Sequence, residues 1–245
     1  RINMSKDIRI KKGLNINLKG EAEKITKKAQ TSTYYTIRPS DFHTIVPKLS
    51  VKVGAKLKAG DPLFFNKSNE AMKFTAPVSG ELTDIIRGEK RKILELRILA
   101  DAEQTYRDFG SKDPKAMAAE EIIDLLLSSG CWPFVKQRPY DVVANPGRKP
   151  KSIFISGYAS APLATDIDYI LDGKERELQA AIIALNKLTP GNIHVSIGKN
   201  GTSPFEGLDN IEIHRVSGPH PIGNVSTQIA KIDPINKGEV VWTLA

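Results

Sequence analysis

The spacing of apolar residues changes part-way along this chain of 245 residues. Between Pro39 and Ala100, apolar and polar residues alternate over short stretches such as VKVGAKLKAGDPLFF, in which Gly54 and Gly60 occupy turn positions. A period of two predicts β-strands, and the glycines predict turns between them. From Lys151 onward, short apolar runs alternate with stretches of helical period. We therefore predict a mixed fold, α+β overall, in which a small, flattened β barrel precedes an α/β domain.

The second region has the alternation of strands and helices that a parallel sheet requires. SIFISGY, IHVSIG and IEIHRV predict strands, whereas PLATDIDYIL and KERELQAAIIALNKL predict helices. The longer helix has one apolar stripe at helical spacing, formed by Leu178, Ala181, Ile182, Leu185 and Leu188. Crossover helices between parallel strands place the following loops at one edge of the sheet. Residues 151–245 are therefore predicted to form a Rossmann-like α/β domain.

Residues 102–150 are predicted to connect the two domains. Asp113 and Pro114 are typical of the start of a helix, and Gly130 is typical of the position beyond its end. The stretch CWPFVKQRPYDVVANPGRKP then predicts an ordered, proline-rich arm. Residues 1–33 are expected to pack on the β domain.

The formal net charge of +8 is concentrated in the first part of the chain. Residues 1–100 contain 21 lysines and arginines against 10 aspartates and glutamates. Such a surface attracts nucleic acid, anionic lipid or an acidic protein. No aromatic residue for base stacking lies between Lys6 and Lys28, so a membrane-side or partner-protein surface is favoured over nucleic acid. A solvated lysine-rich surface is the alternative.

Composition also limits the location and the redox chemistry. The longest apolar run lies within EEIIDLLLSSG and is far too short to span a bilayer, and no secretory leader precedes Met4. A cytoplasmic location without a transmembrane segment is expected. The single cysteine, Cys131, excludes an internal disulfide and a Cys-rich metal or iron–sulfur site.

The turn GYASAPLA follows the first strand of the predicted α/β domain, where a dinucleotide fingerprint would have glycines that admit the pyrophosphate. Gly157 is present, but Tyr158, Ala159 and Ala161 place side chains where the other glycines would be. We predict no tightly bound NADH or flavin pyrophosphate. The phosphate of FMN is less demanding, so a soluble FMN-binding oxidoreductase stays an alternative.

The four histidines predict no metal site. His43 lies in a predicted loop, and His194 and His214 lie on separate predicted strands without a partner at ligand spacing. No nucleophile–base arrangement or paired carboxylates stand out, so the chain is not expected to catalyse a reaction alone.

The stretch SGPHPIGN follows the last of the three predicted strands, where open α/β folds bind ligands. Pro219 and Pro221 bracket His220, and Gly218 and Gly223 lie outside them, which predicts a rigid turn with permissive ends. A histidine displayed in this way can donate a hydrogen bond to a carbonyl oxygen. The alternative is a turn that packs on the neighbouring domain.

The motifs V-x-V-G-x-x-L-K-A-G-D-P-L and A-P-V-S-G-E-L resemble the biotinyl/lipoyl, or barrel-sandwich hybrid, domain, which predicts this fold for residues 34–101. The tetrapeptide EAMK also resembles the attachment site of biotin carriers. In carriers, however, the lysine at the hairpin tip lies seven residues before the Ala-Pro pair. Here Lys73 precedes Ala76 by three, and Asn69 takes the carrier position. We predict an unmodified Lys73 on the strand that leaves the tip, with a biotin or lipoyl carrier as a second alternative.

Longer stretches, in the same order, resemble the A subunit of the bacterial sodium-translocating NADH:quinone reductase. They include KKGLNINLKG, FTAPVSGELTDIIRGEKR, SGCWPFVKQRP, SGPHPIGNVSTQIAKIDP and VVWTL. The resemblance runs from about Ile8 to Leu244 and covers the first half of such a protein, which implies a truncated chain.

The resemblance implies a peripheral subunit on the cytoplasmic face of the bacterial inner membrane. The whole complex passes electrons from NADH through FMN, FAD and a 2Fe-2S centre to ubiquinone while it moves Na⁺. This chain would hold no cofactor itself, and its partners would be the other subunits and ubiquinone. If it binds quinone, His220 is the expected donor. The other expected site residues, which shape or line the loop, are Gly218, Pro219, Pro221, Gly223, Tyr158 and Trp132.

Overall fold

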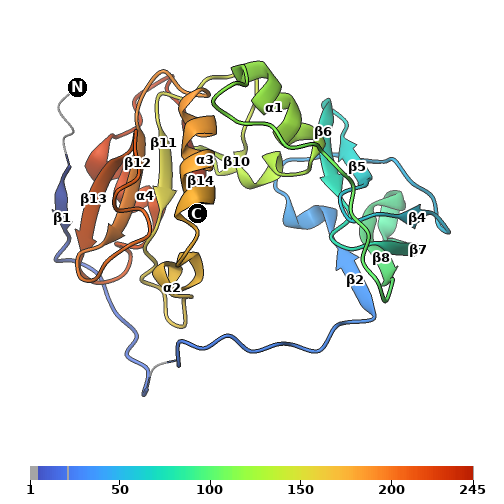
Figure 1. The fold of residues 1–245 in the computed structure, drawn as a ribbon, viewed down its shortest axis with the longest axis horizontal. Coiled ribbons are helices and arrows are strands. Elements are labelled where there is room, and N and C mark those ends of the chain that lie inside the picture. Colours follow the sequence, from blue (N-terminus) through green and yellow to red (C-terminus); the bar gives the residue numbers. More distant parts are fainter. Residues whose placement is uncertain (1–4, 21, 245) are drawn as a thin grey trace.

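The protein, seen here in a computed structural model that describes residues 5–20 and 22–244, contains two regions of sheet (Figure 1). The β-rich region and the α/β region lie at opposite ends of the molecule in this view. Helix α1 (Ala119–Ser128) and the arm that follows it join the two on one side. An extended segment, residues 10–20 and 22–33, runs between them on the other side.

The first region consists of two antiparallel sheets packed against each other. One has the order β2 (Tyr34–Ile37), β8 (Ile93–Ala100), β7 (Gly80–Arg87), β4 (Lys56–Leu57), and the other β3 (Pro47–Leu49), β5 (Pro62–Asn66), β6 (Asn69–Thr75). Short 3-10 turns lie at Pro39–Asp41 and Glu89–Arg91. The core between the sheets includes Leu63, Phe64, Phe74, Leu82, Leu96 and Ile98. The small, flattened β barrel predicted from the alternation therefore consists of two sheets, each with one face in the core.

Lys73 lies on β6, as its distance from the Ala-Pro pair predicts. Asn69 is the first residue of that strand and lies next to the hairpin tip. Lys73 pairs with Phe65 across the hairpin, and its ammonium lies 4.8 Å from the centre of the Phe65 ring. A lysine held along a strand in this way lacks the reach of one at a tip.

The second region has a mostly parallel sheet of seven strands among the described residues. The order is β1 (Asp7–Arg9), β13 (Glu212–Ser217), β12 (Ile193–Gly198), β11 (Ile153–Ser156), β14 (Val241–Leu244), β9 (Lys136–Arg138), β10 (Val142–Val143). Strands β1, β13, β12, β11 and β14 are parallel to one another. Strand β9 pairs antiparallel with β14, and β10 pairs antiparallel with β9. Strands β12 and β13 extend the sheet on one side of β11, and β14 extends it on the other side. The strand order therefore reverses at β11, as in a doubly wound fold.

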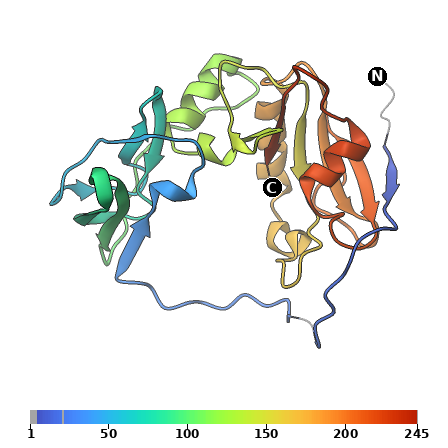
Figure 2. The same ribbon diagram turned by 180° about the vertical axis from the view of Figure 1, so that it is seen from behind.

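Helices cover both faces of this sheet (Figure 2). Helix α3 (Glu175–Asn186) packs Ile182 and Leu185 into the same core as Ile193. Helix α4 (Val225–Ile232), which the sequence patterns did not predict, covers the other face, where Ile229 shares a cluster with Phe154. The short α2 (Ile167–Leu171) precedes α3. Coverage on both faces explains why five of the six residues of β12 are buried.

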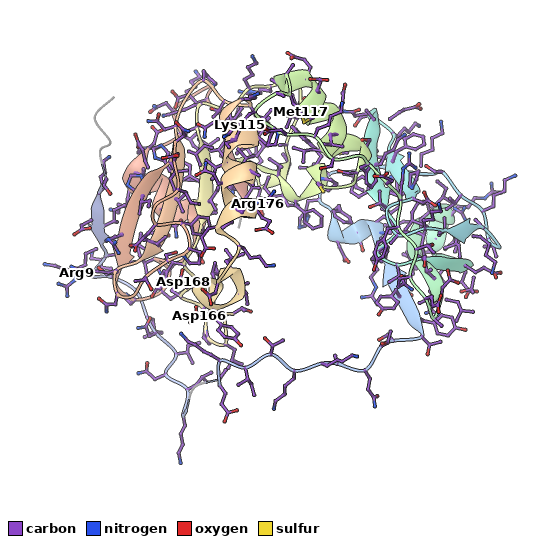
Figure 3. All side chains as sticks on the ribbon, viewed as in Figure 1. Arg9, Lys115, Met117, Asp166, Asp168 and Arg176 are labelled. Atoms are coloured by element: carbon purple, nitrogen blue, oxygen red, sulfur yellow. The ribbon has the colours of Figure 1, made fainter. Side chains whose placement is uncertain are left out.

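The prediction that residues 1–33 pack on the β domain is wrong for the part that forms β1. Ile8 pairs with Val216 of β13, so this segment adds a strand to the α/β sheet. The physical reason is that Ile8 completes the apolar cluster under α4, while its backbone pairs with the otherwise open edge of β13. Figure 3 shows Arg9 at this outer edge of the sheet. Residues 1–4 lie outside the described part of the chain.

The helix of the connection begins later than predicted. The Asp113 carboxylate accepts a hydrogen bond from the Lys115 N–H at 2.9 Å and forms a separate turn. Helix α1 begins at Ala119, where the Glu121 carboxylate accepts from the Ala118 N–H at 2.8 Å. Gly130 follows the helix with a positive φ, as predicted. None of the helices in the described residues has the length and apolar character needed to cross a bilayer.

Candidate functional site

Two loops meet at the carboxyl edge of the α/β sheet. One is the turn after β11, and the other is the SGPHPIGN segment between β13 and α4. The Gly223 N–H donates to the Ser160 hydroxyl at 2.8 Å, and a Cβ at Gly223 would collide with the Ser160 backbone. The absence of a side chain at Gly223 therefore lets the two loops form one unit.

The Ser160 hydroxyl also orients the His220 ring. Its oxygen lies 3.0 Å from Nδ1 of His220. The hydroxyl accepts from Gly223, and when it donates its own hydrogen to Nδ1 the neutral ring carries its proton on Nε2. Nε2 has no hydrogen-bond partner within residues 5–20 and 22–244. In that tautomer His220 has an N–H available for a ligand.

The N-terminal segment holds the same loop from the other side. The Asn15 amide oxygen accepts from the His220 N–H at 2.8 Å, and the Leu14 N–H donates to the His220 carbonyl at 3.0 Å. Gly218 has a φ of +125°, and a Cβ there would collide with the Ile10 carbonyl. The loop therefore packs within its own domain, and these contacts do not involve the neighbouring β domain.

Two hydrogen-bonded turns begin at the prolines of the loop. The Ile222 N–H donates to the Pro219 carbonyl at 3.1 Å, and the Asn224 N–H donates to the Pro221 carbonyl at 2.9 Å. Ile222 is fully buried beneath α4. These turns return the chain to Asn224, where α4 begins.

A cavity of about 250 Å³ lies beside this loop. Tyr158, Ser160 and Gly218 line it together with the N-terminal segment, so two of the predicted site residues, Tyr158 and Gly218, lie on one cavity, whereas His220 does not line it. The Tyr158 ring packs against Gly198, where an added Cβ would lie 3.1 Å from it.

A larger groove of about 890 Å³ adjoins the small cavity, since Ile16, Asn17 and Pro162 line both. Its apolar lining consists of Ile16, Leu18, Ile25, Leu163, Tyr169 and Ile170. Most of these side chains are at least half exposed, and Leu163 is 86% exposed. Lys24 and Asp166 form an ion pair of 2.5 Å at its rim. The sequence patterns did not predict this groove, although the alternation of Ile16 and Leu18 with polar residues was a signal for it.

Trp132 does not belong to this site, contrary to the prediction. Its side chain is fully buried, and its indole N–H donates to the Ala144 carbonyl at 2.8 Å. Its ring packs edge-on against Trp242, with the ring centres 5.3 Å apart. Trp132 is therefore a core residue. The sequence pattern does not distinguish an aromatic residue in the core from one that lines a ligand site.

The turn after β11 differs from a phosphate cradle in backbone as well as in composition. Gly157 packs on Phe205, and its N–H donates to the Ser196 carbonyl at 2.8 Å. The next helix, α2, begins only at Ile167. A helix N-terminus, which favours a bound phosphate, therefore does not follow the turn directly.

At the amino edge of the sheet, the structure brings together two histidines that were predicted to stand apart. Nδ1 of His194 lies 3.0 Å from Nε2 of His214 and 3.1 Å from a carboxylate oxygen of Glu212. Burial lowers the pKa of His194 to about 4, and burial with a smaller effect of His194 lowers the pKa of His214 to about 4. Both rings are neutral at pH 7. The expectation that they lack a partner at ligand spacing is wrong, because it left out the register of β12 and β13.

Comparison with known proteins matches both regions to one family. Residues 8–101 match the NqrA N-terminal barrel-sandwich hybrid domain, and residues 117–245 match the NqrA second alpha/beta domain. The chain belongs to the NqrA family. The barrel-sandwich hybrid and α/β architecture that we predicted is therefore confirmed.

Curated NqrA relatives are named as the A subunit of the Na(+)-translocating NADH-quinone reductase. Those of Neisseria meningitidis serogroup A and Tolumonas auensis are each 32% identical, and that of Pseudomonas aeruginosa is 30% identical. The matches cover 97%, 96% and 97% of this chain but 54%, 53% and 53% of the respective relatives. The chain thus spans about half the length of these NqrA proteins.

Proposed function

We propose that this chain is part of a peripheral subunit of a sodium-translocating NADH:quinone reductase and that it contributes to quinone binding and to assembly of the complex. The observation that carries the quinone proposal is the contact of His220 with Ser160, because Ser160 lines the smaller of two adjoining cavities of different character. The names of the NqrA relatives support the wider assignment.

The small cavity suits the polar head of a quinone. Its volume of about 250 Å³ is below the range typical of drug-sized sites, so it offers room for a ring rather than for a ring with its tail. A quinone carbonyl accepts hydrogen bonds, and Tyr158 on its wall carries a hydroxyl group that can donate one. His220, held by Ser160, adds an N–H that needs no rearrangement of its own hydrogen bonds.

The adjoining groove suits an isoprenoid tail, because its lining is largely apolar and exposed. Burial of this lining by a tail stabilises the complex by about 25 cal/mol for each Å² removed from water. Figure 3 shows Asp166 and Asp168 on the α2 side of the domain, close to the extended N-terminal segment. The Lys24–Asp166 ion pair links these two sides of the groove.

The location and the partners are part of the same proposal. We place the chain on the cytoplasmic face of the bacterial inner membrane, where its basic first region meets other subunits. NADH, flavins, the iron–sulfur centre and Na⁺ are then handled elsewhere in the complex. The single cysteine and the side chains of the GYASAPLA turn support a chain without its own cofactor.

Binding of a soluble short-tailed ubiquinone to the purified chain tests the quinone site. His220→Ala removes one donor, which should weaken binding by about 1 kcal/mol, roughly fivefold, and reduce protection of the loop from proteolysis by quinone. His43→Ala, a change at an exposed histidine of the β domain, is the matched control and should leave both unchanged. Equal affinity of the His220 variant and the unaltered chain would count against the site.

A visible spectrum and an intact mass separate the alternatives. A flavin absorbance would favour the FMN-binding oxidoreductase, and a mass increment on Lys73 would favour the carrier. The proposed subunit shows neither.

A further inference from the structure

A cluster of three potential metal ligands lies at the edge of the sheet opposite the His220 loop. His194 is the second residue of β12, and Glu212 and His214 are the first and third residues of β13. His194 is in register with Glu212, so the three side chains share one face. That face is the one covered by α4, because the His194 ring packs on Phe154 with their centres 4.7 Å apart. The cluster is independent of the proposed quinone site.

The three ligand atoms form a triangle that fits a small cation. Nδ1 of His194 lies 3.0 Å from Nε2 of His214 and 3.1 Å from Oε2 of Glu212, and these last two atoms are 4.0 Å apart. The point equidistant from the corners of a triangle with sides of 3.0, 3.1 and 4.0 Å lies about 2.0 Å from each corner. Zinc–nitrogen and zinc–carboxylate bonds are about 2.0 to 2.2 Å long. At that point Nε2 of His214 and Oε2 of Glu212 lie almost opposite each other, so a four-coordinate ion would draw these two atoms, now 4.0 Å apart, closer together.

When the cluster holds protons and no metal ion, the contact between Nδ1 of His194 and the Glu212 carboxylate is unfavourable. The Lys6 N–H donates to Nδ1 of His214 at 3.2 Å, so a neutral His214 carries its proton on Nε2 and directs it at His194. Nδ1 of His194 is then an acceptor, yet an ionised Glu212 places a second acceptor 3.1 Å away. Two acceptors at this distance repel each other, and a cation between them removes the repulsion.

The surroundings of the cluster fit a bound ion. The Asn192 amide donates to the other carboxylate oxygen of Glu212 at 2.8 Å and orients it, as outer-shell partners of metal sites do. Asn192 and Glu212 line a cavity of about 460 Å³, whereas His194 and His214 do not, so an ion and its water ligand would enter from the side of Glu212, the most exposed of the three ligands. Asp233 favours positive charge at His194, and Lys6 and Lys151 oppose it. Lys151 is offset by ion pairs of 2.7 Å with Asp233 and 2.9 Å with Glu239.

We propose that His194, His214 and Glu212 bind a divalent transition-metal ion of the Zn²⁺ class, with water as the fourth ligand. Two imidazoles and one carboxylate suit Zn²⁺ or Co²⁺, whereas Mg²⁺ and Ca²⁺ prefer oxygen ligands alone. The ion would join β12 to β13 at their amino ends, where Glu212 begins its strand.

Metal binding also affects β1. When Nε2 of His214 binds the ion, its proton moves to Nδ1, where it opposes the Lys6 N–H. We therefore expect the Lys6–His214 contact to open and the adjacent strand β1 to exchange its amide hydrogens faster in the metal-bound form.

Equilibrium dialysis of the chelator-treated chain against Zn²⁺ alone tests the site. The expected result is one Zn²⁺ for each chain and a raised melting temperature. Co²⁺ should give the visible absorption of a four-coordinate site with two nitrogen ligands, one carboxylate oxygen and one water. Absence of stoichiometric binding, or a Co²⁺ spectrum of the six-coordinate aqueous type, would overturn the proposal and leave a shared proton as the occupant.

Three variants separate this site from adventitious binding. Asn192→Ala should weaken Zn²⁺ binding by about 10- to 100-fold, the range for an outer-shell partner. Glu212→Gln, which removes a direct ligand, should weaken it further. His43→Gln, at an exposed histidine remote in sequence, should leave it unchanged. If binding depends on His43 and not on Glu212, the proposal fails. If the Glu212 variant does not fold, the Co²⁺ spectrum of the unaltered chain decides.

Discussion

At the scale of single residues, the His220 loop depends on positions where one added carbon atom meets backbone. Gly13 and Gly218 lie where the N-terminal segment and the loop touch, and Gly223 lies where the loop touches the turn after β11. A Cβ at each would collide with a backbone atom of the other segment. The close approach of the segments that positions His220 therefore depends on these glycines.

Gly218→Ala should lower the free energy of unfolding by about 2 kcal/mol or more, because it combines a positive φ of +125° with a collision at the Ile10 carbonyl. Gly207→Ala is the control, since Gly207 has a φ of +87° but open space around it. It should cost about 1 kcal/mol, the strain of the backbone alone. Urea unfolding of both variants measures the difference, and equal costs would contradict the collision.

The two buried histidines predict acid sensitivity of the metal-free chain. An unfolded histidine has a pKa near 6.5, whereas burial lowers the pKa of His194 and of His214 to about 4. Between these values the unfolded chain binds more protons, so the free energy of unfolding should fall as the pH falls from about 6.5 toward 4. Each pKa unit corresponds to about 1.4 kcal/mol, so the loss should reach several kcal/mol. Urea unfolding over this range in the presence of chelator measures it. A flat profile would show that the rings titrate normally in the fold.

At the scale of elements, the short edge strand β1 shows how a three-residue strand is held. Its backbone pairs with β13 over Asp7, Ile8 and Arg9, and the Arg215 N–H donates to the Lys6 carbonyl at 3.1 Å. Ile8 contributes to the apolar cluster under α4. The strand is stable because it adds both ladder bonds and buried surface to an existing sheet.

Ile8→Ala should therefore lower the free energy of unfolding by about 2 kcal/mol, at the low end for a buried isoleucine because the strand lies at an edge. The same change at Ile16, which is 65% exposed, should have an effect within about 0.5 kcal/mol. Hydrogen exchange gives a second measurement, in which the Arg215 amide loses protection in the Ile8 variant. Unchanged protection there would argue against the pairing of β1 with β13.

At the scale of the whole molecule, one apolar cluster extends through both domains. It contains Leu63 and Phe64 of the β domain and Ile153 and Trp242 of the α/β domain, with Trp132 of the connecting arm among its members. Helix α1 and the 3-10 turn Trp132–Phe134 bridge the two sheets. We therefore expect the domains to unfold as one unit.

Trp132→Ala should lower the free energy of unfolding by about 3 to 5 kcal/mol, the usual cost for a buried tryptophan, and should divide the transition into two. Phe134→Ala is the matched control in the same turn, because Phe134 is 68% exposed. Differential scanning calorimetry distinguishes the two results. Two separate transitions in the unaltered chain would contradict the continuous core.

The types and order of most elements followed from the sequence alone. Alternation with a period of two specified the paired sheets of the β domain, and the stripe through Ile182 and Leu185 specified the buried face of α3. The count from Lys73 to Ala76 placed that lysine on a strand, and the prolines around His220 predicted a turn there. These features are local, because side-chain period and turn chemistry act over a few residues.

The tertiary structure alone decided which distant segments meet. It brought β1 to the edge of β13, brought His194 to His214 and buried Trp132 against Trp242. It also placed the apolar groove between the N-terminal segment and α2. Strand order and register depend on the combined packing of elements far apart in the chain, and a shift of one residue reverses which face a side chain occupies. No local pattern contains that information, which is why the sequence predicted the His220 loop but not the histidine cluster.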